Sequence, residues 1–211
     1  MIWLDDDIWF PPHAYADEDG VLALGGDLQP ERMLLAYDNG IFPWYNEGEP
    51  IVWWSPDPRC VLFPDAMHIA KSMRPVFHSP DWSFRYNTAF ESVIRGCQQT
   101  QRKGQDGTWI NEELIQAMLQ LHRLGDAVSA EAWYGNELVG GLYGVYRGNV
   151  FFGESMFARK ANASKYALIR LIEQEEKRGL KLIDCQIPND HLFRLGAELI
   201  PRAEFLRLLQ Q

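Results

Sequence analysis

The sequence predicts an α+β protein with a mixed, largely antiparallel sheet. Three apolar, strand-like runs follow one another closely, and Gly-Asn pairs that are typical of tight hairpins separate them. A helical pattern and a further strand come next, so the expected order is strand, strand, strand, helix, strand. The three runs cover residues 128–134, 138–146 and 150–156.

The helix after these runs is expected over residues 162–177, and the next strand over 182–187, where Pro188 ends it. Because neighbouring side chains of a strand point to opposite faces, Asp184 and Gln186 should share one face at the end of this apolar strand. Strand ends are common places for chemistry. The alternative is that Asp184 only caps the following turn. A terminal helix is expected near 202–209.

The middle of the chain is expected to hold one strand and two helices. The strand covers 82–86, and Asn87 is expected to cap the helix that follows it. A polar loop over 98–106 comes next. Asn111 then caps a second helix, which Gly125 ends.

The first 58 residues are rich in Pro, Gly and Trp. A short helix is expected from Pro30, with Gly40 at its C-terminal end. Large aromatic residues gather within 41–54, where they could form a small core or a stacking wall for a nucleobase. Pro56-Asp57-Pro58 predicts a rigid boundary. The expected domains are residues 1–58 and 59–211.

Composition predicts a cytoplasmic protein, and nothing in the sequence demands more than a monomer. No signal peptide is expected, and no apolar run reaches the roughly 18 residues that span a membrane. Three cysteines far apart in the sequence predict neither a disulfide framework nor a metal site. The net charge is −9, yet residues 147–181 hold eight bases against four acids. Such a stretch indicates either an interaction surface or an ordinary solvated helix face.

The order of strands and helix matches an acetyltransferase-like (GNAT-like) α+β domain. Acyl-CoA enzymes of this fold usually have a glycine-rich phosphate loop before the helix that follows the third long strand. The corresponding residues, 156–164, contain no glycine. We therefore expect the acyl group to come from a carrier other than CoA.

Seven motifs in this order closely resemble the bacterial leucyl/phenylalanyl-tRNA–protein transferase family, over nearly the whole chain. They are Leu24-Gly25-Gly26-Asp27-Leu28, Gly40-Ile41-Phe42-Pro43-Trp44, Trp53-Trp54-Ser55-Pro56-Asp57-Pro58-Arg59, Gly107-Thr108-Trp109-Ile110, Phe152-Gly153-Glu154-Ser155-Met156-Phe157, Asn162-Ala163-Ser164-Lys165 and Leu182-Ile183-Asp184-Cys185-Gln186.

The resemblance implies an aminoacyltransferase in which a small N-terminal domain packs on the acetyltransferase-like domain. It would move Leu or Phe, and Met less well, from aminoacyl-tRNA to the N-terminal Arg or Lys of acceptor proteins. The products would enter N-degron proteolysis, and neither a metal nor an organic cofactor would be needed.

The resemblance also implies the site residues. Three aromatic residues would surround the 3′-terminal adenosine: Tyr37, Trp44 and Trp109. Four residues would line the pocket for the amino-acid side chain: Leu142, Phe151, Gly153 and Met156. The catalytic residues would be Glu154, Asp184 and Gln186.

This chemistry agrees with the residues themselves. An aminoacyl ester is already activated, so the enzyme needs mainly to position the attacking amine and to handle one proton. Asp184 is expected to orient and polarise the Gln186 amide, whose carbonyl would accept a hydrogen bond from the amine. For Glu154, the structural alternative is an ion pair with Arg159 or Lys165. The rival functions are a CoA-dependent N-acyltransferase and a non-catalytic RNA- or peptide-binding module.

Overall fold

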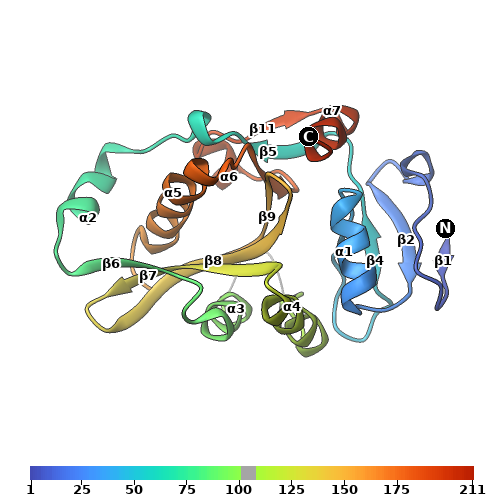
Figure 1. Ribbon diagram of the computed structural model, residues 1–211, viewed down its shortest axis with the longest axis horizontal. Coiled ribbons are helices and arrows are strands. Elements are labelled where there is room, and N and C mark those ends of the chain that lie inside the picture. Colours follow the sequence, from blue (N-terminus) through green and yellow to red (C-terminus); the bar gives the residue numbers. More distant parts are fainter. Residues whose placement is uncertain (101–107) are drawn as a thin grey trace.

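A computed structural model describes residues 1–100 and 108–211, and its strands form two sheets (Figure 1). The smaller sheet has the order β1-β2-β4-β3, and the larger has the order β11-β5-β10-β9-β8-β7-β6. The smaller sheet contains β1 (Trp3–Leu4), β2 (Val21–Gly25), β3 (Phe42–Pro43) and β4 (Val52–Trp54). The larger sheet contains β5 (Arg59–Leu62), β6 (Trp82–Tyr86), β7 (Ala127–Tyr134), β8 (Glu137–Arg147), β9 (Val150–Ala158), β10 (Leu182–Gln186) and β11 (Glu198–Ile200).

Helices cover both faces of the larger sheet (Figure 1). The helix α5 packs on β7 and β8 from one side, while α3 packs on β8 and β9, and α4 on β7, from the other side. The helices are α1 (Pro30–Asp38), α2 (Arg74–His78), α3 (Phe90–Gln98), α4 (Glu112–Leu124), α5 (Ala163–Glu175), α6 (Asp190–Arg194) and α7 (Arg202–Leu209). Within the described part of the chain, no helix combines the length and apolar character needed to cross a bilayer.

The predicted antiparallel meander is confirmed. The strands β7, β8 and β9 pair antiparallel, with left-handed glycines, Gly135 and Gly148, in the two connecting turns. After α5, the chain returns as β10, which pairs parallel to β9, with Asp184 beside Phe152. The predicted α+β class with a mixed, largely antiparallel sheet is therefore correct.

Several helices end where the sequence predicts, and one helix begins elsewhere. Asn111 accepts a hydrogen bond from the Leu114 backbone, and Gly125 ends α4 in a left-handed conformation, as predicted. The Asn87 prediction is wrong, because α3 begins later, with Ala89 as its N-cap. Instead, the Asn87 side chain accepts a hydrogen bond from the Ser129 backbone.

Two strands of the larger sheet were not predicted from the sequence. The short strands β5 and β11 pair with each other and lie at one edge of the larger sheet.

The predicted loop over 98–106 lies mostly outside the described residues. Gln98 is the last residue of α3, and residues 101–106 are not among those described, nor is Gly107.

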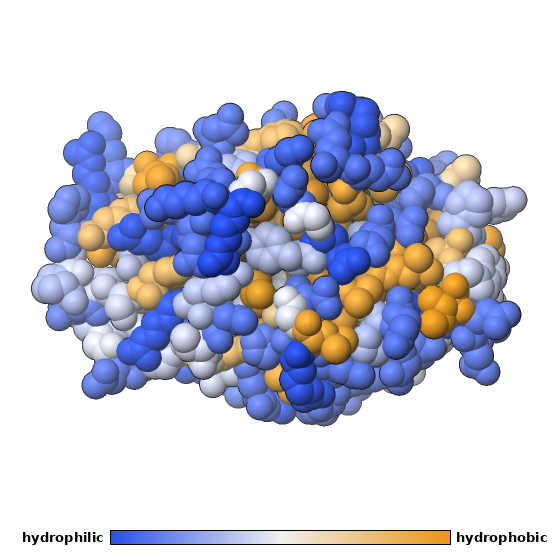
Figure 2. All heavy atoms as spheres, in the orientation of Figure 1, coloured by the Kyte–Doolittle hydropathy of each residue, from blue (hydrophilic) through white to orange (hydrophobic). Residues whose placement is uncertain are grey.

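One continuous hydrophobic core joins the smaller sheet, α1, α3 and α4 to one face of the larger sheet, and a second core fills the space beneath α5. Figure 2 shows that hydrophilic side chains cover most of the face in view, with hydrophobic residues gathered over α1 and the smaller sheet. The N-terminal residues therefore pack firmly on the part of the chain that follows Pro58.

Gly144 lets β8 and β9 approach each other near the centre of the larger sheet. Gly144 is opposite Gly153, and the register of the two strands shifts at this point. A Cβ atom on Gly144 would overlap the carbonyl oxygen of Phe152 and come within 2.5 Å of the Phe151 ring. On Gly153, by contrast, the nearest atom would be 3.5 Å away.

We predict that Gly144→Ala lowers the free energy of unfolding by about 3 kcal/mol, because overpacking here displaces the backbone of a central strand. Gly153→Ala is the matched control, with an expected loss of well under half of that. Urea unfolding measures both. Equal transition midpoints for the two variants would contradict the close approach at Gly144.

Candidate active site

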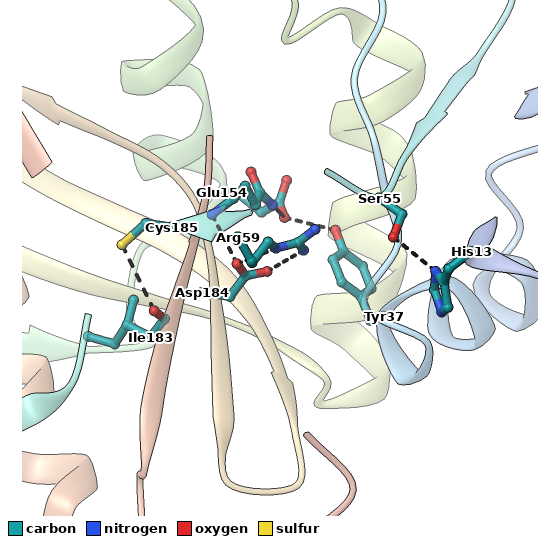
Figure 3. Close-up of polar contacts among 9 residues, drawn as sticks. His13, Tyr37, Ser55, Arg59, Glu154, Ile183, Asp184 and Cys185 are labelled. Carbon is teal, nitrogen blue, oxygen red and sulfur yellow. Dashed lines mark hydrogen bonds and ion pairs between the residues drawn. The ribbon is translucent and has the colours of Figure 1, made fainter. Parts of the chain in front are cut away.

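A buried ion pair joins the end of β10 to the start of β5 (Figure 3). The Nε and Nη2 atoms of Arg59 donate to the two carboxylate oxygens of Asp184, at 2.7 and 2.6 Å. Both side chains are 0% exposed. The Arg59 guanidinium also lies 4.7 Å from the ring centroids of Phe42 in β3 and Phe205 in α7. Four elements therefore meet at one guanidinium, and its two-point contact sets the orientation of the carboxylate.

Asp184 in turn fixes the backbone of Gln186. The register between β10 and β5 shifts between these two residues, and Gln186 has a positive φ of 62°. Its backbone N–H donates to Asp184 Oδ1 at 2.9 Å. The two residues thus come together through a β-bulge, not through the strict alternation that the sequence predicted, since a bulge re-aims the side chain that follows it.

This contact changes the predicted mechanism. Asp184 was expected to orient the side-chain amide of Gln186, but it holds the backbone N–H of that residue. The side-chain amide donates instead to Glu154, with 2.8 Å between Nε2 and Oε1. The alternative that Asp184 only caps a turn describes just one of its contacts. The same carboxylate also neutralises Arg59.

Glu154 in β9 is 7% exposed and accepts two hydrogen bonds on Oε1. One comes from Gln186, and the other from the Tyr37 hydroxyl at 3.0 Å. Burial raises the pKa of Glu154 to about 7, although both hydrogen bonds act in the opposite direction. Neither Arg159 nor Lys165 is among the partners of this carboxylate in the described residues, so the predicted structural alternative is wrong.

Two cavities meet at Glu154 and Gln186. The larger has a volume of about 430 Å³, and the smaller a volume of about 280 Å³. The residues that line both cavities are Trp109, Glu154, Cys185, Gln186 and Asn189. Apart from these, the larger cavity has a mostly apolar wall that includes Leu62, Leu142, Phe151, Gly153, Met156, Leu168, Ile183 and Leu192. The smaller cavity is further lined by Phe42, Pro43, Trp44, Ile187 and Pro188.

The fold brings most of the predicted site residues together at these cavities. The four residues predicted for the amino-acid pocket all line the larger cavity. Trp44 lines the smaller cavity, and Trp109 lines both. Tyr37 differs from its prediction: its side chain is wholly buried behind Glu154, so it presents no surface on which an adenine could stack.

Sequence reasoning missed Arg59 and Phe205. Arg59 directly follows the Pro-Asp-Pro segment and begins an apolar run, and a charged residue in such a place indicates a buried partner. Its partner, Asp184, is 125 positions away in the chain. No local pattern could therefore have identified the pair.

Part of the basic stretch over residues 147–181 is neutralised by acidic side chains. Arg147 forms ion pairs with Asp38 and Asp126, and Arg170 and Arg178 pair with glutamates on their own helical segment. Three of the eight bases thus have acidic partners, which favours the solvated-face interpretation for them.

Among residues 1–100 and 108–211, no three His, Cys, Asp or Glu side chains gather in a way that could hold a metal ion.

Comparison with known proteins gives consistent matches. A family model described as leucyl/phenylalanyl-tRNA protein transferase matches residues 61–210, and a model of the N-terminal domain of that family matches residues 26–57. A leucyl/phenylalanyl-tRNA–protein transferase of Christiangramia forsetii is 54% identical over 211 residues, 99% of this chain and 100% of that protein. The protein of the same name from Flavobacterium johnsoniae is 53% identical over 210 residues, 100% of this chain and 99% of that protein.

Among solved structures, a GCN5-related N-acetyltransferase from Kribbella flavida aligns with a TM-score of 0.40 and 11% identity, over 85% of this chain and 63% of that one. The fold class of the present chain rests on its own strand pairing.

The raised pKa of Glu154 predicts a specific dependence of stability on pH. Between about pH 4.5 and 7, the unfolded chain releases the proton of this group while the folded chain keeps it, so the stability that this group contributes is lost as pH rises. The loss relative to Glu154→Gln should be about 3 kcal/mol, at roughly 1.4 kcal/mol per pKa unit. Urea unfolding of both proteins at pH 4.5, 6 and 8 measures it. Parallel curves for the two proteins would contradict the raised pKa.

Proposed function

Because this chain belongs to the leucyl/phenylalanyl-tRNA protein transferase family, we propose that it moves Leu or Phe, and Met less well, from aminoacyl-tRNA to the N-terminal Arg or Lys of acceptor proteins. The enzyme class itself follows from the family: the chain is an aminoacyltransferase that acts on aminoacyl-tRNA and protein. The proposal adds the acceptor residues, a cytoplasmic monomer, and products that enter N-degron proteolysis. It also keeps the division into domains 1–58 and 59–211.

The observation that carries the proposal is the pair of cavities that meet at Glu154 and Gln186. An aminoacyl-adenosine has an apolar side chain at one end, a flat base at the other and an ester between them. The larger, apolar cavity suits the side chain of Leu, Phe or Met. The smaller cavity, between Trp44 and Trp109, suits the adenine, which aromatic rings bind by stacking. The ester would then lie beside Glu154 and Gln186.

The mostly apolar wall supports relaxed selectivity among similar donors. One methylene in such a pocket changes binding by only about 1–3 kcal/mol, so Leu, Phe and Met cannot be separated sharply. A polar or charged side chain would lose its hydration without gaining a partner from Leu142, Phe151 or Met156. The pocket thus selects a class of amino acid and not a single one.

In the proposed reaction, the α-amine of the acceptor attacks the ester carbonyl. The amine loses a proton, the bond between the carbonyl carbon and the 3′-oxygen of the adenosine breaks, and that oxygen leaves with a proton. The Gln186 amide donates to Glu154 through its nitrogen, so its carbonyl oxygen is the end that can accept a hydrogen bond from the amine. Glu154, with a pKa of about 7, can accept and return a proton near neutral pH.

Asp184, Arg59 and Tyr37 act as positioning residues in this scheme, because their side chains are wholly buried. Asp184 holds the Gln186 backbone, Arg59 holds Asp184, and Tyr37 holds Glu154. Asp184→Asn is consequently a poor test of chemistry. It would leave the Arg59 charge buried and unpaired, at a cost of about 3–5 kcal/mol in stability.

The decisive experiment measures transfer of labelled leucine from charged tRNA to a protein that begins with Arg. Transfer should require intact tRNA, should be unaffected by acetyl-CoA, and should fail with the same acceptor beginning with an acidic residue. Dependence on acetyl-CoA would establish the rival N-acyltransferase. Binding of tRNA without any transfer would favour a non-catalytic binding module.

Two variants should separate donor binding from chemistry. Trp44→Ala removes a stacking surface worth about 1–3 kcal/mol, so the KM for aminoacyl-tRNA should rise about 5- to 150-fold with little change in kcat. Gln186→Met keeps the length of the side chain but removes its amide, so kcat should fall about 100-fold or more. Steady-state kinetics with thermal melts of both proteins measure the split. Equal effects on KM and kcat in two well-folded variants would contradict these assignments.

A further inference from the structure

Two cysteines lie beside the Arg59–Asp184 ion pair, one on each strand. Cys60 follows Arg59 in β5, and Cys185 follows Asp184 in β10. These strands are antiparallel, and Cys60 is paired with Gln186, the residue directly after Cys185. Cys185 is therefore the extra residue of the bulge, directly before the residue that pairs with Cys60, and the two thiols lie close enough to shift each other's pKa.

The two thiols differ in access. Cys60 is wholly buried, whereas Cys185 is partly exposed and lines both cavities of the proposed active site. Its sulfur also lies 3.9 Å from the carbonyl oxygen of Ile183 (Figure 3). A small reagent that enters either cavity would thus meet Cys185 first, with Cys60 directly behind it.

The two thiols also differ in pKa. The neighbouring Cys185 thiol lowers the pKa of Cys60, and the nearby Arg59 charge acts in the same direction, while burial and Asp184 oppose it. The pKa of Cys185, by contrast, is raised by Cys60 and by burial. Because the two thiols interact so closely, the loss of the first proton is a property of the pair and is not assigned to one sulfur. The thiolate is the form of cysteine that reacts with oxidants.

We propose that Cys60 and Cys185 are a modification site at which a peroxide forms a disulfide between β5 and β10. Formation of this disulfide displaces the contacts of the neighbouring residue, Gln186. The effect on activity rests on the function proposed above, whereas the formation of the disulfide does not.

The chemistry balances with hydrogen peroxide as the oxidant. One sulfur of the pair, as its thiolate, attacks a peroxide oxygen, the O–O bond breaks, and hydroxide leaves and takes up a proton as water. The resulting sulfenic acid is attacked by the second thiol. The S–S bond then forms, the S–O bond breaks, and a second water leaves. The sulfurs together lose two electrons, which the peroxide gains.

A disulfide needs its two Cβ atoms about 3.8 Å apart. Forming it would draw the bulge at Cys185 toward β5 and remove this side chain from the wall that the two cavities share. Gln186 is the next residue, and its backbone N–H is bound to Asp184, so its amide would leave Glu154. A displacement of about 1 Å at a reacting group can lower a rate about 100-fold.

The first measurement is the intact mass of the folded protein after treatment with hydrogen peroxide, followed by peptide mapping without reductant. The mass should fall by two hydrogen atoms, with Cys60 and Cys185 linked. Cys97→Ala is the matched control and should form the same disulfide, because Cys97 lies in α3. Cys60→Ala should form none. An unchanged wild-type mass, added oxygen without a link, or a link to Cys97 would overturn the proposal.

The second measurement is aminoacyl transfer. Peroxide should lower wild-type activity about 100-fold, and dithiothreitol should restore it. Cys60→Ala should stay active in peroxide because it cannot form the disulfide. Equal inactivation of Cys60→Ala and wild type would overturn the link between the disulfide and activity. A reduced wild-type protein without any transfer would refute the proposed function alone, since the mass measurement does not depend on it.

Discussion

The buried ion pair between Arg59 and Asp184 is the constraint on which the rest of the structure depends. Two charges withdrawn from water stabilise each other only if both remain in place, and removing one partner costs about 3–5 kcal/mol. Phe42 from the smaller sheet and Phe205 from α7 enclose the guanidinium, whose buried Nη1 atom has no hydrogen-bond partner among the described residues. The smaller sheet, the C-terminal helix and the two strands must therefore assemble together.

A chain of contacts leads from this ion pair to the cavities. Asp184 holds the backbone of Gln186, the Gln186 amide holds Glu154, and Tyr37 supports Glu154 from behind. Of the residues linked by these contacts, Gln186 and Glu154 line both cavities. Arg59, Asp184 and Tyr37 can thus act through position alone, while Glu154 and Gln186 are the two that would meet the substrates in the proposed reaction. The same chain of contacts explains why oxidation of Cys60 and Cys185 would disturb Gln186 and Glu154.

Two irregularities of the sheet place the site where it is. The register of β8 and β9 shifts at Gly144, and the register of β10 and β5 shifts at Gln186. Bulges bend a strand and re-aim its side chains, and they are frequent next to active sites. Here the strand that carries Glu154 is altered by the first shift, and the strand that carries Gln186 by the second. A regular sheet with this sequence would point these two groups differently.

Resemblance to a known family supplied the expected residues of the apolar cavity. The sequence by itself determined the α+β class, the antiparallel meander and the helix after it, because hydrophobic periodicity and turn residues act over short distances. It did not reveal the partner of Asp184, the bulge at Gln186 or the burial of Tyr37. Each of these depends on residues distant in the chain: Arg59 is 125 positions from Asp184, and Glu154 is 117 from Tyr37. Only tertiary structure decides such contacts, since the desolvation that makes a buried charge or hydroxyl seek its partner arises when the core closes around it.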